Sequence, residues 1–159
     1  MLKHISFMVA MVVIALLVFY LAVPFESEFL ESWVTTGPDL TLDTWRELFT
    51  YWAALGIAIS LTAALLWFAL GQWVFSMNRW TTANNKRTVW FILAAVALAA
   101  ALPGMLLMPV VQEGGRKAWP FYLLNNLVVF YFSTLLWSPS SFKYTPLGGS
   151  FMRPLRQWW

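Results

Sequence analysis

The sequence predicts an all-α integral membrane protein with four transmembrane helices, and three observations lead to this fold class. The chain of 159 residues is 60% hydrophobic and only 11% charged, which leaves too few charges to cover a soluble core. Its apolar residues fall into four runs, each long enough to cross a hydrocarbon core of about 30 Å. The polar segments between the runs are short. We therefore expect two helical hairpins in one domain, without a large extramembrane domain.

The first hairpin is predicted from spans 5–23 and 52–73. Span 5–23 follows Lys3 and is expected to end at Pro24. It is too long for the apolar region of a typical cleaved signal peptide, so we interpret it as a membrane span. The second apolar run is longer than a bilayer needs, and Gly71 is a potential weak point near its inner end.

The segment 24–47 is predicted to be an acidic outer loop between these two spans. Aromatic residues recur there every four positions, which would line one face of a helix lying on the membrane surface. Thr44-x-x-Glu47 has the form of a capping box and predicts the start of the second long helix. We expect contacts at this outer surface from Glu26, Glu28, Glu31 and Trp33. The three glutamates are expected to be solvated.

The second hairpin is predicted from spans 88–111 and 119–137, after a short basic loop at 78–87. Pro103 falls inside the third span. A proline in a membrane helix is tolerated when neighbours satisfy the carbonyl that it leaves without a donor, so we expect a kink rather than a break. The chain ends in a basic, aromatic tail at 138–159.

Orientation follows from the basic residues in the short loops. With four spans, seven basic residues fall on the side of the termini and three on the other. The richer side is expected to be cytoplasmic, which places both termini in the cytoplasm. The residues expected to anchor the chain at that surface, or to dock a cytoplasmic partner, are Arg79, Lys86, Arg87, Lys143, Arg153, Arg156, Trp158 and Trp159. Three basic groups in the tail are too few for a nucleic-acid interface.

Tryptophans near the span ends are interpreted as anchors at the level of the lipid headgroups. They are Trp33, Trp45, Trp52 and Trp119 at the outer ends and Trp73, Trp80, Trp90 and Trp137 at the inner ends.

Catalytic chemistry has little basis in this sequence. The chain has no cysteine and one histidine, His4, which excludes thiolate chemistry and leaves no set of metal ligands. The four predicted spans contain no ionisable residue, whereas proton relays and ion-coupled carriers generally place such groups inside the bilayer. We expect no cofactor, no metal and no enzymatic activity.

Polar residues on the fourth span form the strongest intramembrane feature. A stripe of polar side chains follows one helix face and should not point at lipid. Ser60 or Thr62 of the second span could supply hydrogen bonds to it. Otherwise the stripe lines a wet cavity or faces another protein. Its residues are Tyr122, Asn125, Asn126 and Ser133.

Small residues form two seams at which helix backbones can approach closely. These seams serve either packing within the monomer or contacts with another subunit. Span two contributes Gly56, Ser60 and Ala64, and span three contributes Ala94, Ala97, Ala101 and Gly104.

Two functional interpretations remain open. The first is a non-enzymatic protein of the bacterial inner membrane that contacts other membrane-protein subunits, as an accessory or scaffold subunit or as an immunity-type inhibitor. The second is a homo-oligomeric channel or pore lined by the polar face of span four. Small loops, small-residue seams and the missing catalytic groups favour the first.

Overall fold

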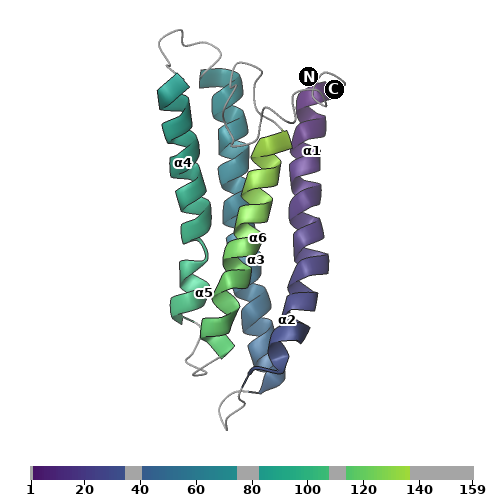
Figure 1. Ribbon diagram of the computed structural model, residues 1–159. Coiled ribbons are helices and arrows are strands. Elements are labelled where there is room, and N and C mark those ends of the chain that lie inside the picture. Colours follow the sequence, from purple (N-terminus) through teal and green to yellow (C-terminus); the bar gives the residue numbers. More distant parts are fainter. Residues whose placement is uncertain (1, 35–40, 75–82, 108–113, 137–159) are drawn as a thin grey trace.

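The computed structural model describes residues 2–34, 41–74, 83–107 and 114–136, and these residues form four long helical rods lying side by side (Figure 1). Four helices are long and apolar enough to cross a membrane, at His4–Glu31, Leu42–Gln72, Lys86–Leu106 and Lys117–Leu136. The predicted all-helical fold with four candidate spans is confirmed, and the protein is described below as a multi-pass membrane protein.

The rods are built from eight elements. They are α1 (Leu2–Leu17), the π-helix η1 (Val18–Ala22), α2 (Val23–Glu31), α3 (Leu42–Ala69), the π-helix η2 (Leu70–Val74), α4 (Ala83–Ala99), α5 (Leu102–Leu107) and α6 (Gly114–Leu136). We call the end of the bundle where α2 ends and α3 begins the acidic end, and the opposite end, where α1 and α4 begin, the basic end. Helices α3 and α6 run in the same direction, from the acidic end to the basic end (Figure 1).

The first rod does not end at Pro24, as the sequence predicts, but continues as α2 to Glu31. The turn before it is a π-helix, in which the backbone N–H of Val23 donates to the carbonyl of Val18, five residues earlier. This wider turn places Pro24 in the first turn of α2, where a residue without an N–H is tolerated. Part of the predicted acidic loop is therefore helix.

The start of α3 also differs from the prediction. Its N-cap is Thr41, three residues before the predicted Thr44, and Thr41 has extended backbone angles. The Oγ1 of Thr41 accepts from the backbone N–H of Thr44 at 3.2 Å. Thr41 therefore satisfies one of the N–H groups that the first turn leaves without a helical partner.

The third rod bends between α4 and α5, at the level where a kink is expected. Pro103 lies in the first turn of α5 and has no N–H to donate to the carbonyl of Ala99. The helix is interrupted at Ala100 and Ala101, and the N–H of Ala101 instead bonds the carbonyl of Leu98 in a tighter turn. The rod then continues toward the acidic end.

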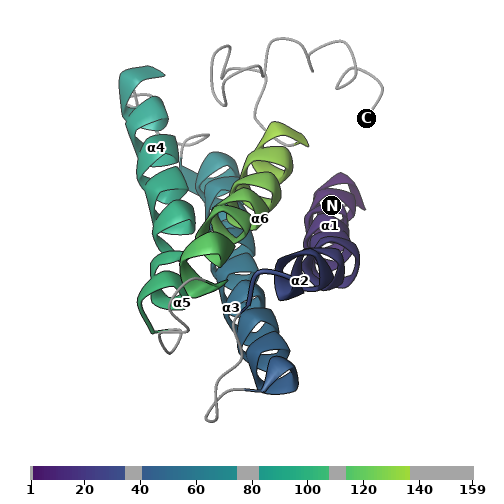
Figure 2. The same cartoon turned by 60° about the horizontal axis from the view of Figure 1, so that its bottom comes forward.

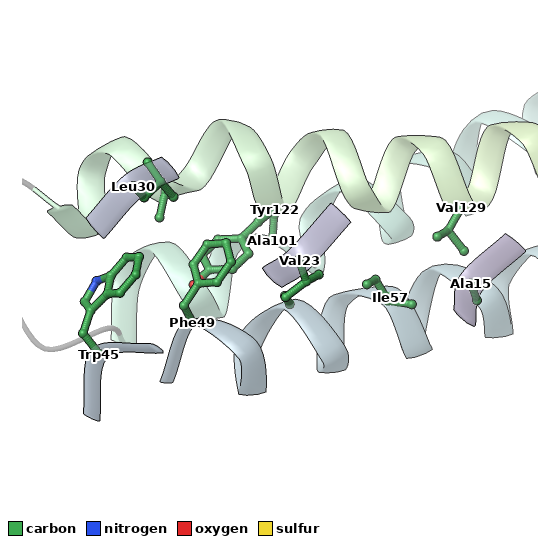
Figure 3. Close-up of a cluster of buried hydrophobic side chains, with 11 residues drawn as sticks. Ala15, Val23, Leu30, Trp45, Phe49, Ile57, Ala101, Tyr122 and Val129 are labelled. Atoms are coloured by element: carbon green, nitrogen blue, oxygen red, sulfur yellow. The ribbon is translucent and has the colours of Figure 1, made fainter. Parts of the chain in front are cut away.

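Buried side chains form two clusters along the bundle. Toward the acidic end, the rings of Phe49 and Tyr122 stack with their centroids 5.0 Å apart, beside Trp45 (Figure 3). Toward the basic end, Trp67 and Trp90 lie in a second cluster with the buried Met11 and Phe130. Trp45 and Trp90 are thus core residues, contrary to their predicted role as headgroup anchors, because these two helix faces point toward the bundle axis.

Helix α6 occupies the centre of the arrangement. It packs against α3 along most of its length and also contacts α1, α2, α4 and α5. Figure 2 shows α6 over α3, with α4 on one side and α1 on the other. A central helix needs an inward surface on several sides, so any polar group on those sides must find a partner within the protein.

Candidate functional site

The polar stripe on α6 points into the bundle. Tyr122, Asn125, Asn126 and Ser133 are each no more than 3% exposed. Because all four side chains are buried, no part of the stripe faces the surface that lipid would cover. The structure brings the four residues together along one rod and surrounds them with side chains of its neighbours.

Glu26 of α2 meets this stripe. The Nδ2 of Asn125 donates a hydrogen bond to the Oε2 of Glu26 at 2.7 Å, and the Glu26 side chain is only 5% exposed. The sequence interpretation of Glu26 as part of a solvated acidic face is therefore wrong. Its neighbour Glu28 is exposed, as expected, because it lies on another side of the helix.

The depth of this contact follows from helix geometry. Glu26 lies 22 residues after His4, about 33 Å along the rod at 1.5 Å per residue, which is close to the thickness of a hydrocarbon core. Asn125 lies eight residues after Lys117, about 12 Å into its own span. Because the two groups are hydrogen-bonded, the carboxyl group of Glu26 lies at the level of Asn125, within the helix His4–Glu31 that is long and apolar enough to cross a membrane. The predicted span 5–23 carries no charged residue, but the rod that contains it continues past Pro24 and so includes Glu26.

Asn126 makes a different contact from the one predicted. Its Nδ2 donates to the backbone carbonyl of Ala97 on α4 at 3.1 Å. Gly56 of α3 lies directly opposite, and a Cβ atom at Gly56 would come within 2.6 Å of the Asn126 Oδ1. The amide is thus clamped between α3 and α4. Thr62, one of the predicted partners, is exposed and bonds the carbonyl of its own helix residue Ala58.

Ser60 and Ser133 are fully buried, and their hydroxyl oxygens have no hydrogen-bond partner in the structure. Ser60 lies eleven residues after Phe49, and Ser133 lies eleven residues after Tyr122, the residue whose ring stacks on Phe49. Because α3 and α6 run in the same direction, the two serines lie at the same level of the bundle. Both are small residues, which lets the helices that carry them pack closely.

The predicted small-residue seams lie mostly inside the monomer. The two glycines make the closest approaches, since a Cβ at Gly104 would come within 2.9 Å of the Tyr122 ring. Ala94 is half-buried. The buried members are Gly56, Ser60, Ala64, Ala97, Ala101 and Gly104.

The other predicted surface residues are dispersed. At the acidic end, Glu31 forms an ion pair with Arg46 of α3, and the Lys117 ammonium lies 5.4 Å from the centroid of the Trp33 ring. At the basic end, Arg87 is exposed and Lys86 is half-buried in the first turns of α4. The predicted anchors that lie outside the described residues are Arg79, Lys143, Arg153, Arg156, Trp158 and Trp159.

Two buried polar contacts were not found from the sequence. Glu26 has the spacing of a core position, since Val23 and Leu30, three residues before and four after, share its helix face and are buried. This spacing can be read from the sequence, but it indicates a buried position only if the helix continues past Pro24. The second contact is the hydrogen bond from the Trp90 Nε1 to the Thr134 Oγ1, 3.1 Å long, which ties α4 to α6 near the basic end.

Taken together, the site is a set of polar contacts that hold the central helix to its neighbours. Asn125 and Asn126 of α6 donate to Glu26 of α2 and to the Ala97 carbonyl of α4. Trp90 of α4 donates to Thr134 of α6. Within the described ranges, no three His, Cys, Asp or Glu residues gather as metal ligands would. The sequence matches no protein-family model, and no curated protein or solved structure is significantly similar to it.

Proposed function

We propose that this chain is a non-enzymatic, multi-pass protein of the bacterial inner membrane that binds other membrane proteins through its helices and loops. It acts as an accessory or scaffold subunit, or as an immunity-type inhibitor, with both termini in the cytoplasm. One observation carries the proposal: the polar groups of α6 are turned inward, while α4 presents small side chains on the exterior.

The inward stripe favours this function over a pore. In a homo-oligomeric channel lined by the polar face of α6, the Asn125, Asn126 and Ser133 side chains would have to contact water. Instead they are buried, and the two amides are hydrogen-bonded to Glu26 and Ala97 of the same chain. Exposing them would break contacts worth about 0.6–2 kcal/mol each in a membrane.

The exterior of α4 offers a surface for a partner helix. Ala95 and Ala99 are both exposed and lie four residues apart, so they form a small-x-x-x-small pair on the outside of the bundle. The pair ends at the bend, where Pro103 cannot donate to the Ala99 carbonyl. A neighbouring helix could approach closely here and donate a hydrogen bond to that carbonyl.

The test is native mass spectrometry of the tagged protein, gently extracted from the membrane of its own host. We expect a complex containing other chains, and we expect Ala99→Leu to release them because the larger side chain keeps a partner helix away. The control is Ile92→Leu, which changes another exposed site on α4 but keeps the volume of the side chain. A homo-oligomer that conducts ions would support the pore instead, and a lone monomer would overturn the proposal.

A further inference from the structure

A groove opens between α1 and α3 at the basic end of the bundle, away from the polar stripe. It has a volume of about 570 Å³. Ile5 and Met8 of α1 form one wall, and Leu66 of α3 lies on the other, and all three are exposed hydrophobic residues. The groove is therefore open toward the side of the protein that faces lipid.

The polar groups of this groove lie mainly at its basic end. There the Gln72 Nε2 and the His4 Nδ1 are hydrogen-bonded at 2.9 Å, and the His4 ring packs edge-on against the Phe68 ring. Farther from the basic end, the hydroxyl of Thr62 donates to the carbonyl of Ala58 at 2.8 Å. A ligand with a polar head at the membrane surface and an apolar chain beyond it would match this distribution.

The size of the groove decides between a lipid chain and a helix. From Thr62 to Gln72 it follows ten residues of the second rod, α3 and η2, about 15 Å at 1.5 Å per residue, which is about half of a bilayer core and so one leaflet. A helix is about 10 Å across, so it could lie only partly within this open groove, whereas a single acyl chain is thin enough to lie within it along its whole length.

Charge indicates which lipid. All residues that line the groove lie within 1–25 and 48–112, and these two segments contain no Asp or Glu. Lys3 directly precedes His4 in the sequence. The Gln72 side chain bonds the His4 Nδ1, which leaves the Nε2 of the ring for a second partner. When Nε2 carries a proton, it can donate to a phosphate oxygen.

We propose that this groove binds one anionic phospholipid of the leaflet at the basic end, with an acyl chain between α1 and α3 and the phosphate at His4. The inference concerns a lipid site separate from the α4 surface proposed for a protein partner. Either can fail without the other.

The experiment uses the full-length protein reconstituted in vesicles of equal amounts of phosphatidylglycerol and phosphatidylethanolamine with identical acyl chains. Native mass spectrometry after mild extraction then identifies the retained lipid. We expect one phosphatidylglycerol per protein in wild type and its loss in Met8→Trp, because the indole fills the groove. Val9→Trp, an exposed position next to Met8 that does not line the groove, is the control and should retain it.

The headgroup contact has its own variant. His4→Ala should lower the amount of lipid retained without changing the preference for phosphatidylglycerol, because the phosphate that His4 contacts is present in both lipids. Leu66→Trp fills the groove from the opposite wall and serves as the second test if Met8→Trp does not fold. The proposal is overturned if wild type retains no lipid, if it retains both lipids equally, or if Val9→Trp and the filling variants behave alike.

Discussion

Gly56 has no room for a side chain, because the Asn126 amide lies against its α-carbon. A Cβ atom there would come within 2.6 Å of Oδ1 and 2.9 Å of Nδ2. We expect Gly56→Ala to push the amide off the Ala97 carbonyl and to lower the free energy of unfolding by about 1–3 kcal/mol. Thermal unfolding in mild detergent measures this. In an Asn126→Ala background the same substitution should cost much less, and simple additivity of the two effects would contradict the clamp.

Glu26 is the acceptor for the buried amide of Asn125. Glu26→Leu removes that acceptor and should destabilise the protein by about 1–3 kcal/mol, because the amide then stays buried without its partner. A loss of that size lowers the midpoint of thermal unfolding by several degrees, about 2–4 °C per kcal/mol for a chain of this length.

Two further variants control this prediction. Glu26→Gln keeps an oxygen acceptor of the same size and should retain most of the stability. Glu28→Leu changes an exposed acid two residues along the same helix and should have an effect within about 0.5 kcal/mol. Equal losses from Glu26→Leu and Glu28→Leu would show that the Asn125 contact contributes nothing specific.

At the scale of elements, an ion pair between Glu31 of α2 and Arg46 of α3 joins these two helices. The two side chains are 25% and 44% exposed, so solvent screens the attraction. We expect Arg46→Gln to lower the stability only slightly at low salt, and less as salt is added. Unfolding curves at low and high salt test this. A large loss that salt does not reduce would mean that Arg46 holds the two helices in another way.

The bend between α4 and α5 follows from the proline in the local sequence, whereas the contacts that the bend makes depend on tertiary packing. The sequence predicts a kink because Pro103 cannot donate to Ala99. Only the structure shows that the bend brings Gly104 against the Tyr122 ring, where a Cβ atom would also come within 3.1 Å of the Trp52 Cβ. That second contact involves a rigid atom close to the backbone, which cannot easily shift away.

At the scale of the whole molecule, the orientation in the membrane is open to a direct test, because the chain has no cysteine. Single cysteines at Glu28 and Arg87 would lie on exposed positions at opposite ends of the bundle. We expect an impermeant maleimide to label Glu28→Cys in intact cells and Arg87→Cys only after the membrane is permeabilised. The reverse pattern would overturn the assignment of the basic end to the cytoplasm.

The all-helical fold, with four helices long and apolar enough to cross a membrane, was determined by the sequence alone. A bilayer requires about 20 apolar residues per helix whatever the helices pack against, so local composition is sufficient. The tertiary structure decided which faces meet. The central place of α6 buries Glu26 beside Asn125, directs Asn126 to the Ala97 carbonyl rather than to Ser60 or Thr62, and turns Trp45 and Trp90 into the core. These outcomes depend on contacts between residues distant in the chain, which no local pattern specifies.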